Sequence, residues 1–267
     1  MLSFFDKIRK QKLRDLELAI FWLGQNSFII KTSNGTIFAI DLYLSRDKNC
    51  KYVHSKPPIK PEDFKGHYVF CTHDHLDHTD PITLPIIAKN SQNTMFFGPS
   101  ESCKHLIELG IGRDRVKTLE VGVTYNIGDL RVTPYYSVAP EEVEYENLKV
   151  THFGYIFEVE GIKVYNMGDT SKNILKEKEK LLEPIICKNV DIAMLPIVGD
   201  IPQRKPEDAF LIAKTIKPKI VIPSHYNCFK DRTIDPKRFI KLFKEEQKIR
   251  PVVIPYKGVY IYSLRNL

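Results

Sequence analysis

The chain has no hydrophobic run long enough to cross a membrane. A membrane-spanning helix needs about 20 consecutive apolar residues, whereas the longest early apolar stretch, Ile20 to Leu23, has the length of part of a strand. The segment from Met1 to Leu18 is charged throughout and contains no apolar core of the signal-peptide type. We therefore expect a cytoplasmic protein with no membrane partner.

Cysteines are few, and their spacing is irregular. The five of them never form a C-x-x-C pair: Cys50, Cys71, Cys103, Cys187 and Cys228. A disulfide framework or a structural zinc site needs paired and regularly spaced thiols. We therefore expect reduced, mostly buried thiols, in agreement with a cytoplasmic location.

No stretch has the composition of a flexible linker, a disordered tail or a low-complexity segment. Hydrophobic residues make up 43% of the 267 residues and charged residues 27%, which are ordinary values for a globular protein. We predict a single domain over residues 1–267, made of two pseudo-repeated halves, about 18–150 and 151–267. The net charge of +7 suits an anionic small-molecule substrate or RNA, and equally a lysine-rich surface without a partner. Because no stripe of aromatic and basic residues accompanies it, nucleic acid is the less favoured partner.

Apolar runs and turn signals predict strand meanders with helices interleaved later in each half. Asn34-Gly35 lies between two apolar runs, which is typical of a hairpin, and a second hairpin is expected around Glu160-Gly161. Strands are expected at residues 16–23, 27–32, 36–40, 67–71, 94–97, 121–127, 131–136, 155–159, 162–166, 190–195, 219–222, 252–254 and 259–262. Helices are expected at residues 80–89, 100–109, 171–182, 206–216 and 235–247. Such elements favour two mixed sheets packed face to face and covered by helices.

Three of the eight histidines fall within six positions, in the run His73-Asp74-His75-Leu76-Asp77-His78 directly after an apolar strand. In an extended or turning loop, residues two apart point the same way, so His73 and His75 can share one metal ion. Asp77 and His78 can then face a second ion. Imidazole nitrogens and carboxylate oxygens suit Zn²⁺, Mn²⁺ or iron. The alternative, a polar loop with chance histidines, leaves buried polar groups that each need a partner.

Two further candidate ligands lie far along the chain, each at a strand end. Asp169 follows Gly168, which allows a sharp turn, and its carboxylate can bridge two cations. The alternative for Asp169 is an N-cap of the helix at 171–182. His225 ends the run Pro223-Ser224-His225, and its alternative is an ordinary polar loop residue. Functional side chains often gather on loops at strand ends, which favours the metal interpretation for both.

This order of motifs resembles the metallo-β-lactamase superfamily of hydrolases: H-x-H-x-D-H, then Gly-Asp after a strand, then Pro-x-His at a late strand end. The segment from Phe21 to Asp41 and the run Phe97-Gly98-Pro99 resemble the branch that contains the bacterial L-ascorbate-6-phosphate lactonase. The similarity covers about Leu18 to Phe243. It implies an α/β (α+β) fold, a four-layer αββα sandwich with metals at one edge between the sheets, and a homo-oligomer.

The resemblance also implies a role for each ligand. His73 and His75 would bind the first metal, Asp77, His78 and His225 would bind the second, and Asp169 would bridge the two. In the same way, Asp41 and Asp208 match acidic positions that support ligand histidines, because metal-bound imidazole donates its other N–H to a carboxylate. The alternative for Asp41 and Asp208 is a turn or cap residue.

One departure from the superfamily pattern concerns the first metal. Many members carry a further histidine after the strand that here ends near Tyr136, but this chain has Ser137-Val138-Ala139-Pro140 there. The first site is then expected to be weaker, or to favour Mn²⁺, which accepts water and oxygen ligands. His152, Glu141 or Glu142 could compensate, and His152 could instead support the fold or line the pocket.

These residues predict a hydrolase in which two divalent ions, Zn²⁺ or Mn²⁺, activate a hydroxide against a small ester, a lactone or a phosphorylated substrate. Asp77 would orient or deprotonate the water, and Tyr226 would donate to an oxyanion or leaving group. Two alternatives remain: a phosphodiesterase or nuclease of the same superfamily, and a metal-binding relative without catalysis. The loops at 43–66 and 137–152 are expected to select the substrate.

Overall fold

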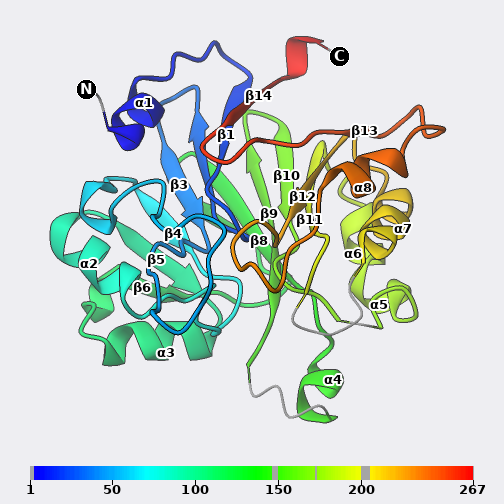
Figure 1. Cartoon of the computed structure of the whole chain (residues 1–267). Coiled ribbons are helices and arrows are strands. Elements are labelled where there is room, and N and C mark those ends of the chain that lie inside the picture. The colour runs from blue at the N-terminus through cyan, green and yellow to red at the C-terminus, as the bar shows by residue number, and fades with distance from the viewer. Residues whose placement is uncertain (1–2, 146–149, 172, 200–204, 267) are drawn as a thin grey trace. The chain divides into compact units, whose positions relative to one another are not determined.

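The computed structural model describes residues 3–145, 150–171, 173–199 and 205–266. The chain divides into two compact units, the first made of residues 1–119 with 254–267 and the second of residues 120–253. In its described residues, each unit contains a seven-stranded sheet and its own helices (Figure 1). The organisation as a single domain with two pseudo-repeated halves stays a prediction.

The sheet of the first unit is half antiparallel and half parallel. Its strand order is β14 (Val259–Ser263), β1 (Glu17–Trp22), β2 (Phe28–Thr32), β3 (Ile37–Ile40), β4 (Tyr68–Phe70), β5 (Met95–Gly98) and β6 (Val116–Thr118). Pairing is antiparallel from β14 to β3 and parallel from β3 to β6. The parallel half brings the ends of β3, β4 and β5 to one edge. The histidine motif follows β4 directly, so it lies at that edge.

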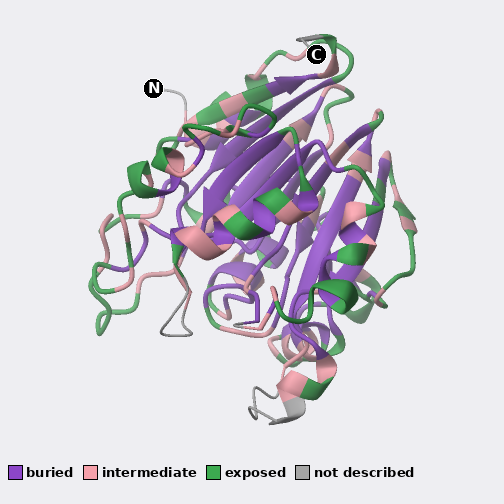
Figure 2. Ribbon diagram, turned by 90° about the vertical axis from the view of Figure 1, so that its right-hand side faces the viewer, coloured by how far each residue is buried: buried purple, intermediate pink, exposed green. Residues whose placement is uncertain are grey.

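Helices of the first unit share a hydrophobic core with its sheet. The helices are α1 (Phe4–Lys10), α2 (Thr83–Asn90) and α3 (Ser100–Glu108), with 3₁₀ turns η1 (Pro61–Asp63), η2 (Arg113–Arg115) and η3 (Leu264–Asn266). Ile8, Ile87 and Leu106 from the three helices belong to one buried cluster with Phe21 and Val69 from the strands. Strands are mostly buried, and exposed residues lie mainly on helices and loops (Figure 2).

The sheet of the second unit has a similar plan. Its strand order is β13 (Arg250–Pro251), β12 (Ile220–Ser224), β11 (Ile192–Pro196), β10 (Ile162–Asn166), β9 (Phe153–Val159), β8 (Leu130–Tyr136) and β7 (Tyr125–Ile127). Pairing is parallel from β13 to β10 and antiparallel from β10 to β7. Because β10 and β12 are parallel to the β11 strand between them, their carboxyl ends meet at one edge of the sheet.

Helices of the second unit are mostly short: α4 (Pro140–Tyr145), α5 (Lys178–Leu181), α6 (Glu183–Ile186), α7 (Pro206–Ile216) and α8 (Lys237–Lys241). The prediction at 206–216 agrees with α7. The continuous helix predicted at 171–182 is wrong, because its described residues form turns up to the start of α5, and residue 172 lies outside the described residues. No described helix of either unit combines the length and apolar character that crossing a membrane requires.

Candidate metal centre

The histidine loop (residues 73–78) is a tight, internally bonded turn at the end of β4. The backbone N–H of His78 donates to the His75 carbonyl at 2.9 Å. The Thr79 hydroxyl closes the loop by donating to the His73 carbonyl at 2.8 Å. Leu76 points away and is 68% exposed, whereas His73 and His78 are fully buried. The turn therefore gathers its polar side chains on the inner side.

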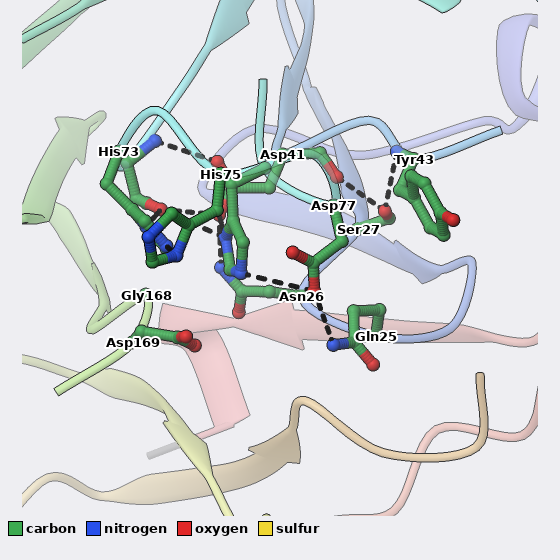
Figure 3. A network of polar contacts seen from close by, with 12 residues as sticks. Gln25, Asn26, Ser27, Asp41, Tyr43, His73, His75, Asp77, Gly168 and Asp169 are labelled. Atoms are coloured by element: carbon green, nitrogen blue, oxygen red, sulfur yellow. Dashed lines mark hydrogen bonds and ion pairs between the residues drawn. The ribbon is translucent and has the colours of Figure 1, made fainter. Parts of the chain in front are cut away.

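Two pairs of potential ligand atoms come together within this loop (Figure 3). His73 Nε2 lies 2.9 Å from His75 Nδ1. His78 Nε2 lies 3.6 Å from an oxygen of Asp77. The structure thus brings together both pairs that the residue spacing predicts. Imidazole nitrogens and a carboxylate oxygen at such separations are donors that a divalent cation accepts.

Asp41 fixes the orientation of His78. It follows β3 with a φ of 46°, a left-handed conformation that turns its carboxylate toward the end of β4. One carboxylate oxygen accepts the Nδ1–H of His78 at 2.6 Å. The same oxygen accepts from the Asn26 amide at 2.7 Å, and the other accepts from the Thr72 backbone N–H at 2.8 Å. Since Nδ1 carries the proton, the lone pair of His78 Nε2 is the one that can bind a metal.

Thr72 links the Asp41 carboxylate to His73 and fixes the tautomer of that histidine as well. Its hydroxyl donates to Asp41 at 2.7 Å, and His73 Nδ1 lies 3.0 Å from that hydroxyl oxygen. Because the hydroxyl proton is used on Asp41, the bond to His73 requires Nδ1 to be the donor. His73 therefore also presents the Nε2 lone pair. One buried carboxylate, directly and through one hydroxyl, selects the tautomer of two histidines.

The turn between β1 and β2 supports the site from a second side. Gly24 and Gln25 have φ values of 95° and 52°, which let the chain reverse sharply. The Gln25 amide donates to Asp77 at 2.8 Å. The Ser27 hydroxyl donates to the Asp41 backbone carbonyl at 2.5 Å. Sequence reasoning missed these residues and Thr72, although the polar run 25–27 between two apolar strands is the signal that marks them.

The second unit holds another pair of potential ligands. Asp169 follows β10 through Gly168, which has a φ of 63° and whose N–H donates to the Asn166 side chain at 3.0 Å. His225 follows β12 directly, with a φ of 61°. Its Nε2 lies 3.0 Å from an oxygen of Asp169. The two residues that the sequence predicted from strand ends therefore meet at one sheet edge, as their parallel strands require.

Two other residues that the sequence predicted for the site, Tyr226 and Asp208, also lie in the second unit. Tyr226 is 2% exposed, and burial together with the Asp235 carboxylate raises the pKa of its phenol well above the usual range. Asp208 accepts the backbone N–H of Lys205 at 3.0 Å at the start of α7. That contact is a helix-capping interaction, which is the alternative that the sequence left open for Asp208.

In the segment that lacks the expected histidine, Ser137 is hydrogen-bonded to His152 and to Thr170. The Ser137 N–H donates to the His152 carbonyl at 3.1 Å, and the Ser137 carbonyl accepts from the Thr170 hydroxyl at 3.0 Å. His152 is buried, and its Nδ1 lies 3.0 Å from the Val150 carbonyl. Since a carbonyl only accepts, Nδ1 carries the proton and Nε2 the lone pair. His152 thus has the tautomer of a potential ligand, beside the position of the absent histidine.

These residues fit divalent metal ions. Fixed tautomers, two histidine nitrogens 2.9 Å apart and a carboxylate held by an amide are features of a preorganised ligand set. The described residues therefore include groups of histidine and aspartate side chains able to bind metal.

Comparisons with known proteins agree with this chemistry. A family model described as the beta-lactamase superfamily domain matches residues 19–225. A UPF0173 metal-dependent hydrolase from Archaeoglobus fulgidus is 30% identical over 247 residues, covering 90% of this chain and 97% of that protein.

Solved structures share the fold. Igni18, a metallo hydrolase from Ignicoccus hospitalis, is 21% identical with a TM-score of 0.68, covering 93% of this chain and 99% of that chain. An isothiocyanate hydrolase from Delia radicum gut bacteria is 16% identical with a TM-score of 0.68, covering 92% and 99%. The predicted α/β fold class of the metallo-β-lactamase type is therefore confirmed. The chain belongs to the metallo-β-lactamase superfamily, and within it to the UPF0173 metal-dependent hydrolases.

Proposed function

We propose that the chain hydrolyses a small ester or lactone with two divalent metal ions. The observation that carries the proposal is the contact between Asp41 and His78, at 2.6 Å with both side chains fully buried. A buried carboxylate that accepts one N–H of an imidazole is the usual outer partner of a metal-binding histidine. The lactonase branch of the superfamily, which the segment from Phe21 to Asp41 resembles, supports the choice of ester and lactone bonds.

The proposed ligands keep the roles that the resemblance implies. His73 and His75 would hold the first ion, Asp77, His78 and His225 would hold the second, and Asp169 would contribute its carboxylate to both. The donor pairs within each unit support this assignment, since their potential ligand atoms lie 2.9 Å apart in His73–His75, 3.6 Å in Asp77–His78 and 3.0 Å in Asp169–His225. The superfamily membership supports the joint use of both sets.

The first site is proposed to be the weaker one. Its protein ligands are two histidines and the shared Asp169, and an oxygen-rich remainder favours Mn²⁺ over Zn²⁺. His152 is the candidate that would compensate, because its Nδ1 is held by a backbone carbonyl at 3.0 Å. Glu142 is the weaker candidate, since its carboxylate accepts a hydrogen bond from Ser171.

When bound, the ions supply Lewis acidity and lower the pKa of water to about 7. Asp77 contributes a carboxylate whose position the Gln25 amide holds, so that it can orient the attacking water or accept its proton. Tyr226 keeps its phenol protonated at neutral pH, because its pKa is raised. Because Tyr226 follows the proposed ligand His225 directly, its O–H is proposed to donate a hydrogen bond to the oxygen on which negative charge develops. The five cysteines are free thiols, which supports a cytoplasmic location.

A chelation and reconstitution experiment tests the proposal. Purified protein is stripped of metal, and hydrolysis is measured on a panel of aryl esters, lactones, an isothiocyanate and bis(p-nitrophenyl) phosphate. We expect no hydrolysis without metal, recovery with Mn²⁺ or Zn²⁺, and a preference for esters or lactones. Asp77→Ala should lower kcat by at least about 100-fold, in the range that general acid–base catalysis contributes.

The matched control is Asp63→Ala, which changes an exposed aspartate of η1 in the same unit and should leave kcat unchanged. Hydrolysis that persists without metal would contradict the proposal. A preference for the phosphodiester substrate would favour the phosphodiesterase alternative over an esterase or lactonase. Metal binding without hydrolysis of any compound would favour the non-catalytic relative.

A further inference from the structure

A pocket opens at the end of β8 in the second unit. It is lined by Tyr136, Val138, Pro140, Val143 and Thr151, and we call it the α4 pocket after the helix that borders it. Its volume is about 150 Å³. Val138 is 2% exposed, and the other four residues are half-buried, so Val138 forms the floor and the pocket reaches the surface. A cavity of this size can hold a molecule as large as benzene.

Among the residues that the structure describes, none that lines the α4 pocket carries a charged side chain. Three of its residues are apolar, and Tyr136 and Thr151 add one hydroxyl each. Two acids of the neighbouring helix have other partners: Glu141 pairs with Lys180 at 2.5 Å, and Glu142 accepts from the Ser171 hydroxyl. An anionic group would lose its hydration in this pocket without gaining a counter-charge. The chemistry therefore fits an uncharged, mainly apolar group.

The pocket wall is bonded to the turn that carries Asp169. Ser137 lies between the lining residues Tyr136 and Val138, and it is fully buried. Its carbonyl accepts from the Thr170 hydroxyl at 3.0 Å and from the Ser171 N–H at 3.1 Å. These donors are the two residues that follow Asp169, so the pocket lies within a few residues of this proposed ligand. Two hydrogen bonds therefore join the wall of the pocket to the turn that carries Asp169.

We infer that the α4 pocket binds the uncharged acyl or ring portion of the ester or lactone, a group of up to about six carbon atoms. The inference rests on the proposed function for the reaction, and it narrows the substrate class. The apolar portion of the substrate enters the second unit beside Asp169, and any charged portion of the substrate lies elsewhere. Part of the predicted substrate loop, residues 146–149, lies outside the described residues.

Acyl-group selectivity tests the inference. The ratio of kcat/KM for p-nitrophenyl benzoate to that for p-nitrophenyl acetate is measured with Mn²⁺-loaded full-length protein. Val138→Phe fills the pocket and should lower this ratio at least tenfold. Val143→Ala widens its border and should raise the ratio for p-nitrophenyl hexanoate over acetate at least threefold. The control Val123→Phe adds the same ring at a 42% exposed position of the same unit and should leave both ratios unchanged.

A binding measurement separates failure of the inference from failure of the proposed function. Zn²⁺-loaded protein is titrated with benzyl alcohol while backbone amide signals are followed by NMR. Signals of Tyr136, Val138 and Thr151 should shift in the wild type, and the shifts should be lost in Val138→Phe. If no ester is hydrolysed but these signals shift, the proposed function fails and the pocket assignment stands. Unshifted pocket signals, or acyl ratios that neither pocket variant changes, would overturn the inference.

Discussion

Asp41 shows how much of a metal site depends on a residue that need not touch the metal. Its buried carboxylate holds His78 directly and His73 through the Thr72 hydroxyl. Both histidines therefore present Nε2 before any ion arrives. Loss of such a partner typically lowers metal affinity by about 10- to 100-fold.

We expect Asp41→Asn to lower metal affinity within that range, because the amide cannot accept from all its present donors. Isothermal titration with Zn²⁺ measures the change. Asp80→Asn is the matched control: Asp80 is equally buried and accepts from the Leu44 and Thr83 backbone N–H groups, whereas Asp41 accepts from a histidine. Both variants should lose stability, and only the first should lose affinity. An equal loss of affinity in both would contradict a specific role of Asp41.

The ligand side chains could be found in the sequence, whereas their supports could not. His73, His75, Asp77 and His78 lie in one short run, so the spacing alone indicates a metal site. Asp41 was found only through the superfamily resemblance. The amide of Gln25 reaches Asp77 only after β1, β2 and β4 have assembled, and no local pattern encodes that contact.

Elements were predictable where packing and local preference agree. The β9–β10 hairpin has the predicted two-residue turn, Glu160-Gly161, and strand register confirms it. The helix expected at 171–182 fails for local reasons: the Ser171 hydroxyl accepts the Asn173 N–H at 2.8 Å in a competing turn, and Pro184 follows closely. The helix expected at 235–247 is shortened to α8, and residues 242–245 after it form turns. α1 was missed, although its Ser3–Asp6 capping box is a start signal.

The hairpin turn also leads to a stability prediction. Glu160 and Gly161 both have positive φ, 51° and 79°, which is the pattern of a type I′ turn. Asn tolerates that conformation better than Glu, so Glu160→Asn should raise the free energy of unfolding by roughly 0.5–1 kcal/mol. Urea unfolding with an unchanged m-value measures it. Gly161→Ala should lower the free energy of unfolding. If Glu160→Asn lowers it as well, the contacts of the Glu160 side chain stabilise the fold more than the backbone preference of Asn does.

At the scale of the whole molecule, local sequence patterns do not reveal which distant strands pair with each other. β14 near the C-terminus joins the first sheet beside β1, with Glu17 opposite Ser263. A periodicity argument finds both strands but does not say which sheet receives them. The order of strands, and hence the edge at which Asp169 and His225 meet, follows from the parallel pairing of β10, β11 and β12.

Metal-dependent stability tests whether both units supply ligands. A ligand that binds only the folded state stabilises it by about 2.7 kcal/mol at 100 times its Kd. We expect wild-type protein to gain roughly that amount in unfolding free energy at such a Zn²⁺ concentration. His73→Ala in the first unit and His225→Ala in the second should each remove most of the gain. His54→Ala is the control, because His54 stacks on Tyr256, 3.7 Å between ring centroids, and is not a proposed ligand. A full metal-dependent gain in His225→Ala would mean that His225 holds no ion, and the proposed ligand set of the second ion would then have to be abandoned.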